Sequence, residues 1–154
     1  ASPGALAFVA FCEANGVEVF FVTNRDQGDA TFDLALGNLR AAGFDSARAE
    51  NLRVLRETSN KEAVQAQIRT DFNVVASLGD NLNDFARRYY VTDVAEREAL
   101  MHEDAAKFGS DYIVFPNPTD GHWIRAIFGE SEPVASDANR EILRHAAIGL
   151  DSER

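Results

Sequence analysis

Two aspartates in a short polar segment are the residues of this chain best suited to hold a metal ion. Residues 77–85 have the sequence Ser-Leu-Gly-Asp-Asn-Leu-Asn-Asp-Phe and follow an apolar run, Val-Val-Ala, at 74–76. If that run is a buried strand, Asp80 and Asp84 lie on the loop at its carboxyl end, where open α/β sheets place their ligands. Two carboxylates suit Mg²⁺, which prefers oxygen ligands and keeps several waters. An acidic turn after a strand explains the same residues, so metal binding is one of two interpretations.

Two further segments carry groups that could bind a phosphoryl oxygen. Thr23 and Asn24 follow the β-branched and aromatic run 17–22, and a hydroxyl and an amide at a strand end can donate hydrogen bonds to an anion. Lys61 is expected in the first turn of a helix, where the helix dipole disfavours a cation unless an anion compensates it. Taken singly, a turn initiated by Asn and a solvated lysine explain these residues as well. Together, the three segments predict a site for phosphate and metal.

The composition limits the partners of the chain. Its 154 residues, 45% of them hydrophobic and 26% charged, are normal for one globular domain with a proper core. The net charge of −10 argues against nucleic acid as a partner, because affinity for a phosphate backbone is built from clustered Lys and Arg. Cys12 is the only cysteine, so no disulfide can form within the chain. No apolar run approaches the ~18 residues of a membrane span.

Strands and helices are predicted to alternate along the chain. Helices are expected where apolar residues recur at helical spacing, and strands where β-branched and aromatic residues gather. The predicted helices cover residues 5–14, 31–42, 60–70, 94–108, 122–128 and 138–150, and the predicted strands cover residues 17–22, 52–55, 72–78 and 112–115. This alternation favours an α/β fold with a doubly wound, mostly parallel sheet. The chain is expected to form a single core domain over residues 1–154.

Several of these segments resemble the haloacid dehalogenase superfamily and, more closely, the class C acid phosphatases, which are bacterial phosphomonoesterases. Residues 22–25 (Val-Thr-Asn-Arg), 61–63 (Lys-Glu-Ala) and 79–85 (Gly-Asp-Asn-Leu-Asn-Asp-Phe) resemble the second, third and fourth motifs of the superfamily. The segment 116–118 (Pro-Asn-Pro) and Trp123 extend the likeness, which runs from about residue 1 to about residue 130. The resemblance implies a Rossmann-like core of the haloacid dehalogenase type.

The resemblance also implies a reaction, which is the Mg²⁺-dependent hydrolysis of phosphomonoesters through an aspartyl-phosphate. By position, Thr23 and Asn24 would hold the phosphate. Lys61 would bind it and balance the charge of the pentacoordinate state. Asp80 would be a direct metal ligand, and Asp84 either a water-mediated ligand or a residue that orients Lys61 and the metal-bound waters. Lys61 and Asp84 are therefore the implied catalytic residues.

Substrate and compartment are implied by the resemblance in the same way. The substrate would be a small phosphomonoester, with nucleoside monophosphates as one class. The compartment would be the bacterial periplasm or the outer membrane.

The first motif of the superfamily, Asp-x-Asp followed closely by Thr, does not occur in this chain. In the family this motif supplies the nucleophile and the general acid/base, on a central strand that would lie between the strands expected at 72–78 and 17–22. The sequence therefore resembles the carboxyl-terminal part of a class C acid phosphatase without its central first strand. We expect no turnover from these 154 residues alone.

Two interpretations of function stay open. The first is an acid phosphatase that is active in the complete protein. The second is a non-catalytic, truncated α/β domain that keeps a residual anion or metal site, and whose open strand edges could bind another chain or a second copy as a homo-oligomer.

Smaller departures from the family pattern change the charge of the predicted site. Val64 stands where the family usually has Arg, and Asn83 stands where relatives commonly have an acid. Neither change is expected to abolish metal binding while Asp80 is in place. Trp123 is interpreted as a packing residue, and His122 as a surface group or a satisfied polar group.

Overall fold

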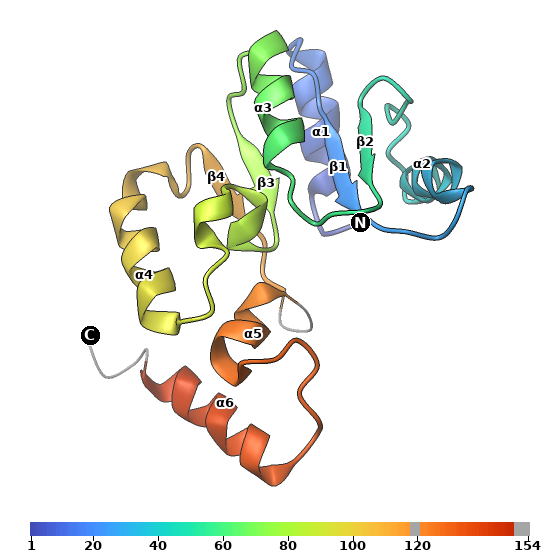
Figure 1. The fold of residues 1–154 in the computed structure, drawn as a ribbon. Helices are drawn as coiled ribbons and strands as arrows, with labels where there is room; N and C mark the ends of the chain where they lie inside the picture. Colours follow the sequence, from blue (N-terminus) through green and yellow to red (C-terminus); the bar gives the residue numbers. More distant parts are fainter. Residues whose placement is uncertain (118–120, 150–154) are drawn as a thin grey trace. The chain divides into compact units, whose positions relative to one another are not determined.

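The computed structural model describes residues 1–117 and 121–149, and the chain divides into two compact units (Figure 1). The first unit is Ala1–Gln67 and the second begins at Ile68. Each unit contains one two-stranded parallel sheet. Among the described helices, none is long and apolar enough to cross a membrane.

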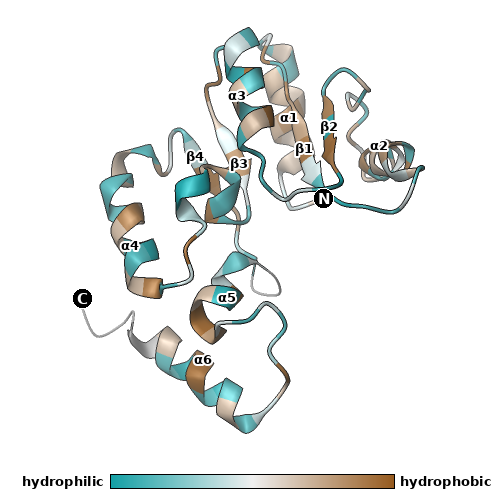
Figure 2. Cartoon of the chain, viewed as in Figure 1, coloured by the Kyte–Doolittle hydropathy of each residue, from teal (hydrophilic) through white to brown (hydrophobic). Residues whose placement is uncertain are grey.

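Helices and strands alternate in the first unit. In chain order the elements are α1 (Ala5–Ala14), β1 (Phe21–Asn24), α2 (Thr31–Ala41) and β2 (Leu52–Leu55), and α3 (Glu62–Asp71) runs on into the second unit. The two strands pair in parallel, with Phe21 opposite Leu52 and Asn24 opposite Leu55. Most of α1 is apolar (Figure 2), and Leu6 of this helix packs against Gly43. A Cβ on Gly43 would lie 2.9 Å from Leu6 Cδ1, so the close approach of α1 to the turn after α2 requires glycine.

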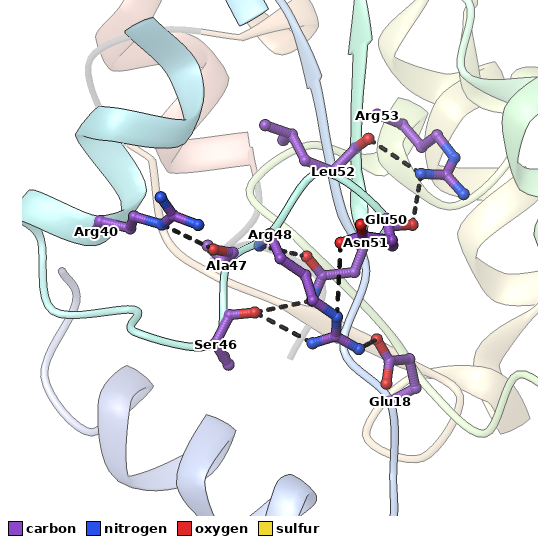
Figure 3. Close-up of polar contacts among 9 residues, drawn as sticks. All are labelled: Glu18, Arg40, Ser46, Ala47, Arg48, Glu50, Asn51, Leu52 and Arg53. Carbon is purple, nitrogen blue, oxygen red and sulfur yellow. Dashed lines mark hydrogen bonds and ion pairs between the residues drawn. The ribbon is translucent and has the colours of Figure 1, made fainter. Parts of the chain in front are cut away.

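A network of polar contacts holds the loop that precedes β2 (Figure 3). The buried side chain of Asn51 accepts a hydrogen bond from the backbone N–H of Arg48 at 2.9 Å and donates one to the carbonyl of Ser46 at 3.2 Å. Arg48 also forms an ion pair with Glu18, with 2.5 Å between Nη2 and Oε1. Because Glu18 precedes β1 and Asn51 precedes β2, these contacts join the two segments that enter the sheet and support its register.

The second unit contains short helical turns as well as helices and strands. Its elements are β3 (Ser77–Gly79), the 3₁₀ helices η1 (Leu82–Asp84) and η2 (Arg87–Tyr89), α4 (Val94–Glu103), the 3₁₀ helix η3 (Ala105–Lys107), β4 (Tyr112–Val114), α5 (His122–Phe128) and α6 (Asp137–Gly149). β3 and β4 pair in parallel, with Ser77 opposite Tyr112. In Figure 1 the short helical turns that follow β3, coloured yellow-green, lie between β3 and α4, and η1 contacts β3 while η2 contacts α4.

An aromatic core lies directly beneath the segment that follows β3. Leu82, Phe85 and Tyr89 are buried, and the ring of Phe85 stacks on that of Tyr112 with 4.8 Å between centroids. The Tyr89 hydroxyl donates a hydrogen bond of 2.6 Å to the buried carboxylate of Asp104. Leu82 is both a core residue and the first residue of η1, so the core fixes the position of the polar segment above it.

The structure confirms an α/β fold with parallel strand pairs, and three of the predicted strands, at 17–22, 72–78 and 112–115, are shorter than expected. The helices predicted at 5–14 and 122–128 and the strand predicted at 52–55 have the expected bounds. Residues 17–20 lie outside β1 and residues 72–76 outside β3, because a strand extends only as far as its pairing partner does.

Other predictions about the fold remain predictions. The doubly wound sheet, the absent central strand and the single domain over 1–154 are among them. Pro118 of the Pro-Asn-Pro segment and Leu150, the predicted end of the last helix, lie outside the described residues.

Candidate functional site

Asn24 closes β1 and uses its side-chain amide to hold the segment that follows β2. Its Nδ2 donates hydrogen bonds to the backbone carbonyls of Leu55 at 3.1 Å and Thr58 at 2.6 Å. A primary amide has two N–H groups, and here both meet carbonyl oxygens of the same segment. Asn24 therefore positions the chain that leads to Lys61, whereas the sequence predicted it as a donor to phosphate.

Lys61 lies at the start of α3, as predicted. Its carbonyl accepts a hydrogen bond from the N–H of Gln65 at 2.9 Å, and the helix proper begins at the next residue. The side chain of Asn60 accepts from the N–H of Glu62 at 3.0 Å, so Asn60 caps this end of the helix. Thr58 connects the two ends of this segment, because its carbonyl binds Asn24 and its hydroxyl accepts from the N–H of Asn60 at 3.0 Å.

An exposed ion pair lies directly after the two strands of the first unit. Arg56 follows β2, and its Nε lies 2.9 Å from Oδ1 of Asp26, two residues beyond β1. The same oxygen accepts the N–H of Gly28 at 3.1 Å, and these two hydrogen bonds lower the pKa of Asp26 below its ordinary value. This pair was not predicted from the sequence, although Arg56 directly follows the strand predicted at 52–55 and Asp26 lies four residues beyond the strand predicted at 17–22.

Asp80 begins the acidic loop immediately after β3. Its Oδ2 accepts a hydrogen bond of 2.7 Å from Nδ2 of Asn117, a residue of the Pro-Asn-Pro segment. The indole N–H of Trp123 donates to the carbonyl of Asn117 at 3.1 Å. Trp123, predicted as a packing residue, thus also fixes the residue that contacts Asp80.

Asp84 is locked to the start of the same loop. Its Oδ2 accepts the N–H of Asn81 at 3.2 Å, and its own N–H donates to the carbonyl of Asn81 at 2.9 Å. A Cβ on Gly79 would lie 2.5 Å from the Cβ of Asp84 and 2.7 Å from its Oδ2. Such contacts are shorter than van der Waals packing allows, so Asp84 can take this position only because residue 79 is glycine.

A buried arginine and a stacked histidine complete the surroundings of the loop. Arg97 of α4 is buried and donates to the side-chain oxygens of Asn81 and Asn83. His122 Nε2 lies 3.1 Å from the carbonyl of Val91, and its ring stacks on Tyr90 with 4.0 Å between centroids. Burial and the charge of Arg97 lower the pKa of His122, so the imidazole stays neutral at pH 7.

The environment of His122 could be predicted from the sequence, whereas that of Arg97 could not. His122 has the satisfied polar environment that the sequence analysis expected as one alternative. Arg97 was missed, because the charged residues that surround it in α4 gave no signal of burial.

The donor set of the acidic loop fits Mg²⁺ in its chemistry. Within residues 1–117 and 121–149, no cluster of three or more His, Cys, Asp or Glu side chains could hold a metal ion. Asp80 and Asp84 supply two carboxylates from one loop, and Mg²⁺ is commonly held by one or two carboxylates together with waters. The loop lacks the sulfur and imidazole ligands that zinc prefers.

The residues predicted to bind phosphate and metal fall into two groups, one in each unit. Thr23, Asn24 and Lys61 belong to the first unit, where the Asn24–Thr58 contact connects the strand end to the start of α3. Asp80 and Asp84 belong to the second unit, in a single loop after β3. Acidic residues at the carboxyl end of a parallel strand are typical of α/β proteins with a ligand site at that end.

Comparison with a family model assigns the chain to a family. The model of the HAD superfamily, subfamily IIIB (acid phosphatase), matches residues 1–123. The chain therefore belongs to the subfamily IIIB acid phosphatases of the haloacid dehalogenase superfamily. This result confirms the resemblance predicted from the motifs.

Solved structures agree with this assignment. The chain is similar to the class C acid phosphatase from Bacillus anthracis, with 28% sequence identity and a TM-score of 0.77 over 94% of this chain. A second structure of that phosphatase, with tungstate bound, matches with the same identity, TM-score and share of this chain. The chain spans 59% of the length of the first structure and 60% of the second.

Proposed function

We propose that this chain is part of an acid phosphatase that hydrolyses small phosphomonoesters with the help of Mg²⁺. The observation that carries the proposal is the acidic loop of a subfamily IIIB chain, in which Asp80 and Asp84 are both held by hydrogen bonds after a parallel strand. An acidic turn that only faces solvent would not require glycine at position 79. It would also not require Asn117 beside Asp80, held in place by a hydrogen bond from Trp123.

The first unit supplies the groups that bind the phosphoryl oxygens. The hydroxyl of Thr23 donates a hydrogen bond, and the ammonium of Lys61 balances the negative charge that is largest in the transition state. Asn24 contributes by holding the segment from Leu55 to Thr58, since its two N–H groups are used there.

The second unit supplies the ligands of the metal. Asp80 binds Mg²⁺ directly, and Asp84 binds it through water or orients the waters around it. Bound Mg²⁺ would neutralise the phosphoryl oxygens of the substrate. Asn117 limits the rotation of the Asp80 carboxylate by donating to one oxygen, which leaves the other oxygen to the metal.

The chemical step needs a nucleophile that this chain does not contain. The resemblance implies an Asp-x-Asp pair on a central strand of a doubly wound core, with an aspartyl-phosphate as the intermediate. This chain covers 59% of the Bacillus anthracis phosphatase. We assign the Asp-x-Asp pair to the part of the protein that corresponds to the rest of that phosphatase. Tungstate, bound by that relative, is an oxyanion like phosphate, which supports an oxyanion site in this family.

The proposed substrate class and compartment follow from the family resemblance alone. Nucleoside monophosphates are the proposed substrate class, and the bacterial periplasm or outer membrane is the proposed compartment. The absence of Asp-x-Asp from these 154 residues favours one second candidate, a non-catalytic domain that associates through open strand edges.

One experiment separates these candidates. The protein is purified from its source, its intact mass is measured, and hydrolysis of p-nitrophenyl phosphate is followed with Mg²⁺ and with EDTA. We expect a mass above the 16.9 kDa of this chain and turnover that EDTA abolishes.

Two outcomes would contradict the proposal. Turnover by a verified 16.9 kDa chain would show that the Asp-x-Asp pair is not required. An inactive protein of larger mass that carries the Asp-x-Asp motif would favour the non-catalytic domain.

A further inference from the structure

A buried arginine of α4 contacts both asparagines of the acidic loop. Arg97 is 7% exposed. Its Nη2 donates to Oδ1 of Asn81 at 3.1 Å, and its Nη1 donates to Oδ1 of Asn83 at 3.2 Å. Nη1 also donates to the backbone carbonyl of Tyr89 at 2.7 Å, at the end of η2. One planar guanidinium therefore joins α4, η2 and the acidic loop.

The hydrogen bonds of Arg97 stand in place of an ion pair. Among the residues that the structure describes, no carboxylate lies within ion-pair distance of Arg97. Burial without such a partner lowers the pKa of Arg97, and the charge remains favourable only while neutral oxygens solvate it. Two of its three acceptors are side chains of the loop, so the loop and the arginine depend on each other.

The contacts continue from Arg97 to the carboxylates. Asn81 receives Arg97 on its side-chain oxygen and donates its backbone N–H to Oδ2 of Asp84. Gly121 approaches the other side of the Asn81 amide so closely that a Cβ there would overlap with it. Asn83 lies directly before Asp84 in η1. A shift of Arg97 would therefore move Asn81, which donates to the Asp84 carboxylate, and Asn83, which precedes Asp84 in the chain.

We propose that Arg97 is a positioning residue, whose buried guanidinium sets the conformation of the 80–84 loop through Asn81 and Asn83. This proposal rests on the proposed function, in which Asp80 and Asp84 serve Mg²⁺. Arg97 touches neither substrate nor metal in this assignment. A lysine could not replace it, because a single ammonium cannot hold two amide oxygens and a carbonyl in the geometry of the planar fork.

The test compares Arg97→Lys with Arg88→Lys in the full-length protein. Arg88 is a control in the same unit, because its ion-pair partners are Glu103 and Asp104 and not the loop. Two quantities are measured, which are hydrogen exchange of the backbone amides of residues 80–84 without metal, and the dissociation constant of Mg²⁺ by calorimetry. Thermal unfolding of each variant identifies loss of the fold.

We expect Arg97→Lys to accelerate exchange at residues 81 and 84 and to weaken Mg²⁺ binding by about tenfold, as outer-shell substitutions commonly do. Arg88→Lys should leave both quantities within about twofold of the wild type, because exposed ion pairs contribute little. If the wild type binds Mg²⁺ and both variants behave alike, the positioning role is wrong and the proposed function stands. If the wild type does not bind Mg²⁺, the proposed function fails.

A second pair of variants keeps the proposal testable if Arg97→Lys does not fold. Asn83→Ala removes an acceptor from the loop and leaves Arg97 in place, whereas Asn83→Asp keeps an acceptor. Asn83→Ala should accelerate exchange at residue 84, and Asn83→Asp should not. Equal exchange in the two variants would overturn the positioning role.

Discussion

The two units hold their predicted functional residues by different means. In the first unit Asn24 is held by the backbone carbonyls of Leu55 and Thr58, which any residue at those positions would provide. In the second unit the acidic loop is held by side chains, above all the guanidinium of Arg97 and the amide of Asn117. The first arrangement depends on one side chain, Asn24, and on the path of the chain opposite it, whereas the second depends on several particular side chains. Distant substitutions should therefore affect the second unit more than the first.

The largest expected effect is that of Asp80→Asn. An amide keeps the size of the side chain and an acceptor for Asn117, but it removes the negative charge that binds Mg²⁺ in the proposed function. We expect Mg²⁺-dependent kcat/KM for p-nitrophenyl phosphate to fall by about 10²–10³-fold in the active protein. The matched control is Asp26→Asn, which removes a carboxylate of the first unit that pairs with exposed Arg56. A loss of similar size in the control would break the comparison between the units.

Asn24→Ala should affect the first unit without changing metal binding. The substitution removes both side-chain hydrogen bonds of Asn24, so the Thr58 carbonyl loses its contact with the end of β1, whereas the Leu55 carbonyl keeps the N–H of Arg25. A displacement near 1 Å can cost about 10²-fold in rate, so we expect a loss of about 10–100-fold in kcat/KM. The dissociation constant of Mg²⁺ should stay unchanged. Weaker Mg²⁺ binding in this variant would show that the units are not separable in function.

Gly79→Ala should lower stability through a steric effect within the second unit. The added Cβ would lie 2.5 Å from the Cβ of Asp84, and overpacking of this kind costs about 1–3 kcal/mol. The matched control is Gly37→Ala in α2, where no atom lies within 4 Å of the added Cβ. Alanine there should raise the free energy of unfolding by about 0.5–1 kcal/mol. Urea denaturation measures the free energy of unfolding of both variants. We expect it to fall in Gly79→Ala and to rise in Gly37→Ala.

Much of the fold and of the candidate site could be predicted from local sequence. The apolar helix at 5–14 and the acidic loop after the strand both depend on neighbouring residues, and the prediction placed them well. Strand lengths depend on pairing partners far along the chain, which is why residues 72–76 were wrongly included in a strand. The Asn24–Thr58 contact joins residues 34 positions apart, and no local pattern indicates it.

Arg97 shows a different limit of prediction. It lies between Glu96 and Glu98 in a helix that is largely exposed, and arginine is rarely buried without an acidic partner. Its burial follows from the fold of η1 and η2, which presents three oxygens to it. Asn83, noted in the sequence only for its effect on charge, supplies one of these oxygens.

The smallest expected effect concerns the core of the second unit at low pH. Hydrogen bonds from Lys107 and Tyr89 lower the pKa of Asp104 below its ordinary value of 3.8. The unfolded chain therefore takes up the proton first, so this stabilisation is present above about pH 4 and is lost as the pH falls through the folded-state pKa. Tyr89→Phe should lower the free energy of unfolding at pH 7 by about 1 kcal/mol and lessen its fall in acid. Mg²⁺ binding should not change, because Tyr89→Phe keeps the ring and its core packing and removes only the hydroxyl. A change would show that the Tyr89–Asp104 hydrogen bond also holds the acidic loop.

The burial of Arg97 also bears on how the protein responds to ionic strength. Dissolved ions screen charges that face water, with a Debye length of about 8 Å at 0.15 M salt, but they screen buried groups much less. The exposed Arg56–Asp26 pair will weaken as salt is added, whereas Arg97 is only 7% exposed and its guanidinium binds neutral oxygens. The loop should therefore keep its conformation in brines that remove most surface electrostatics.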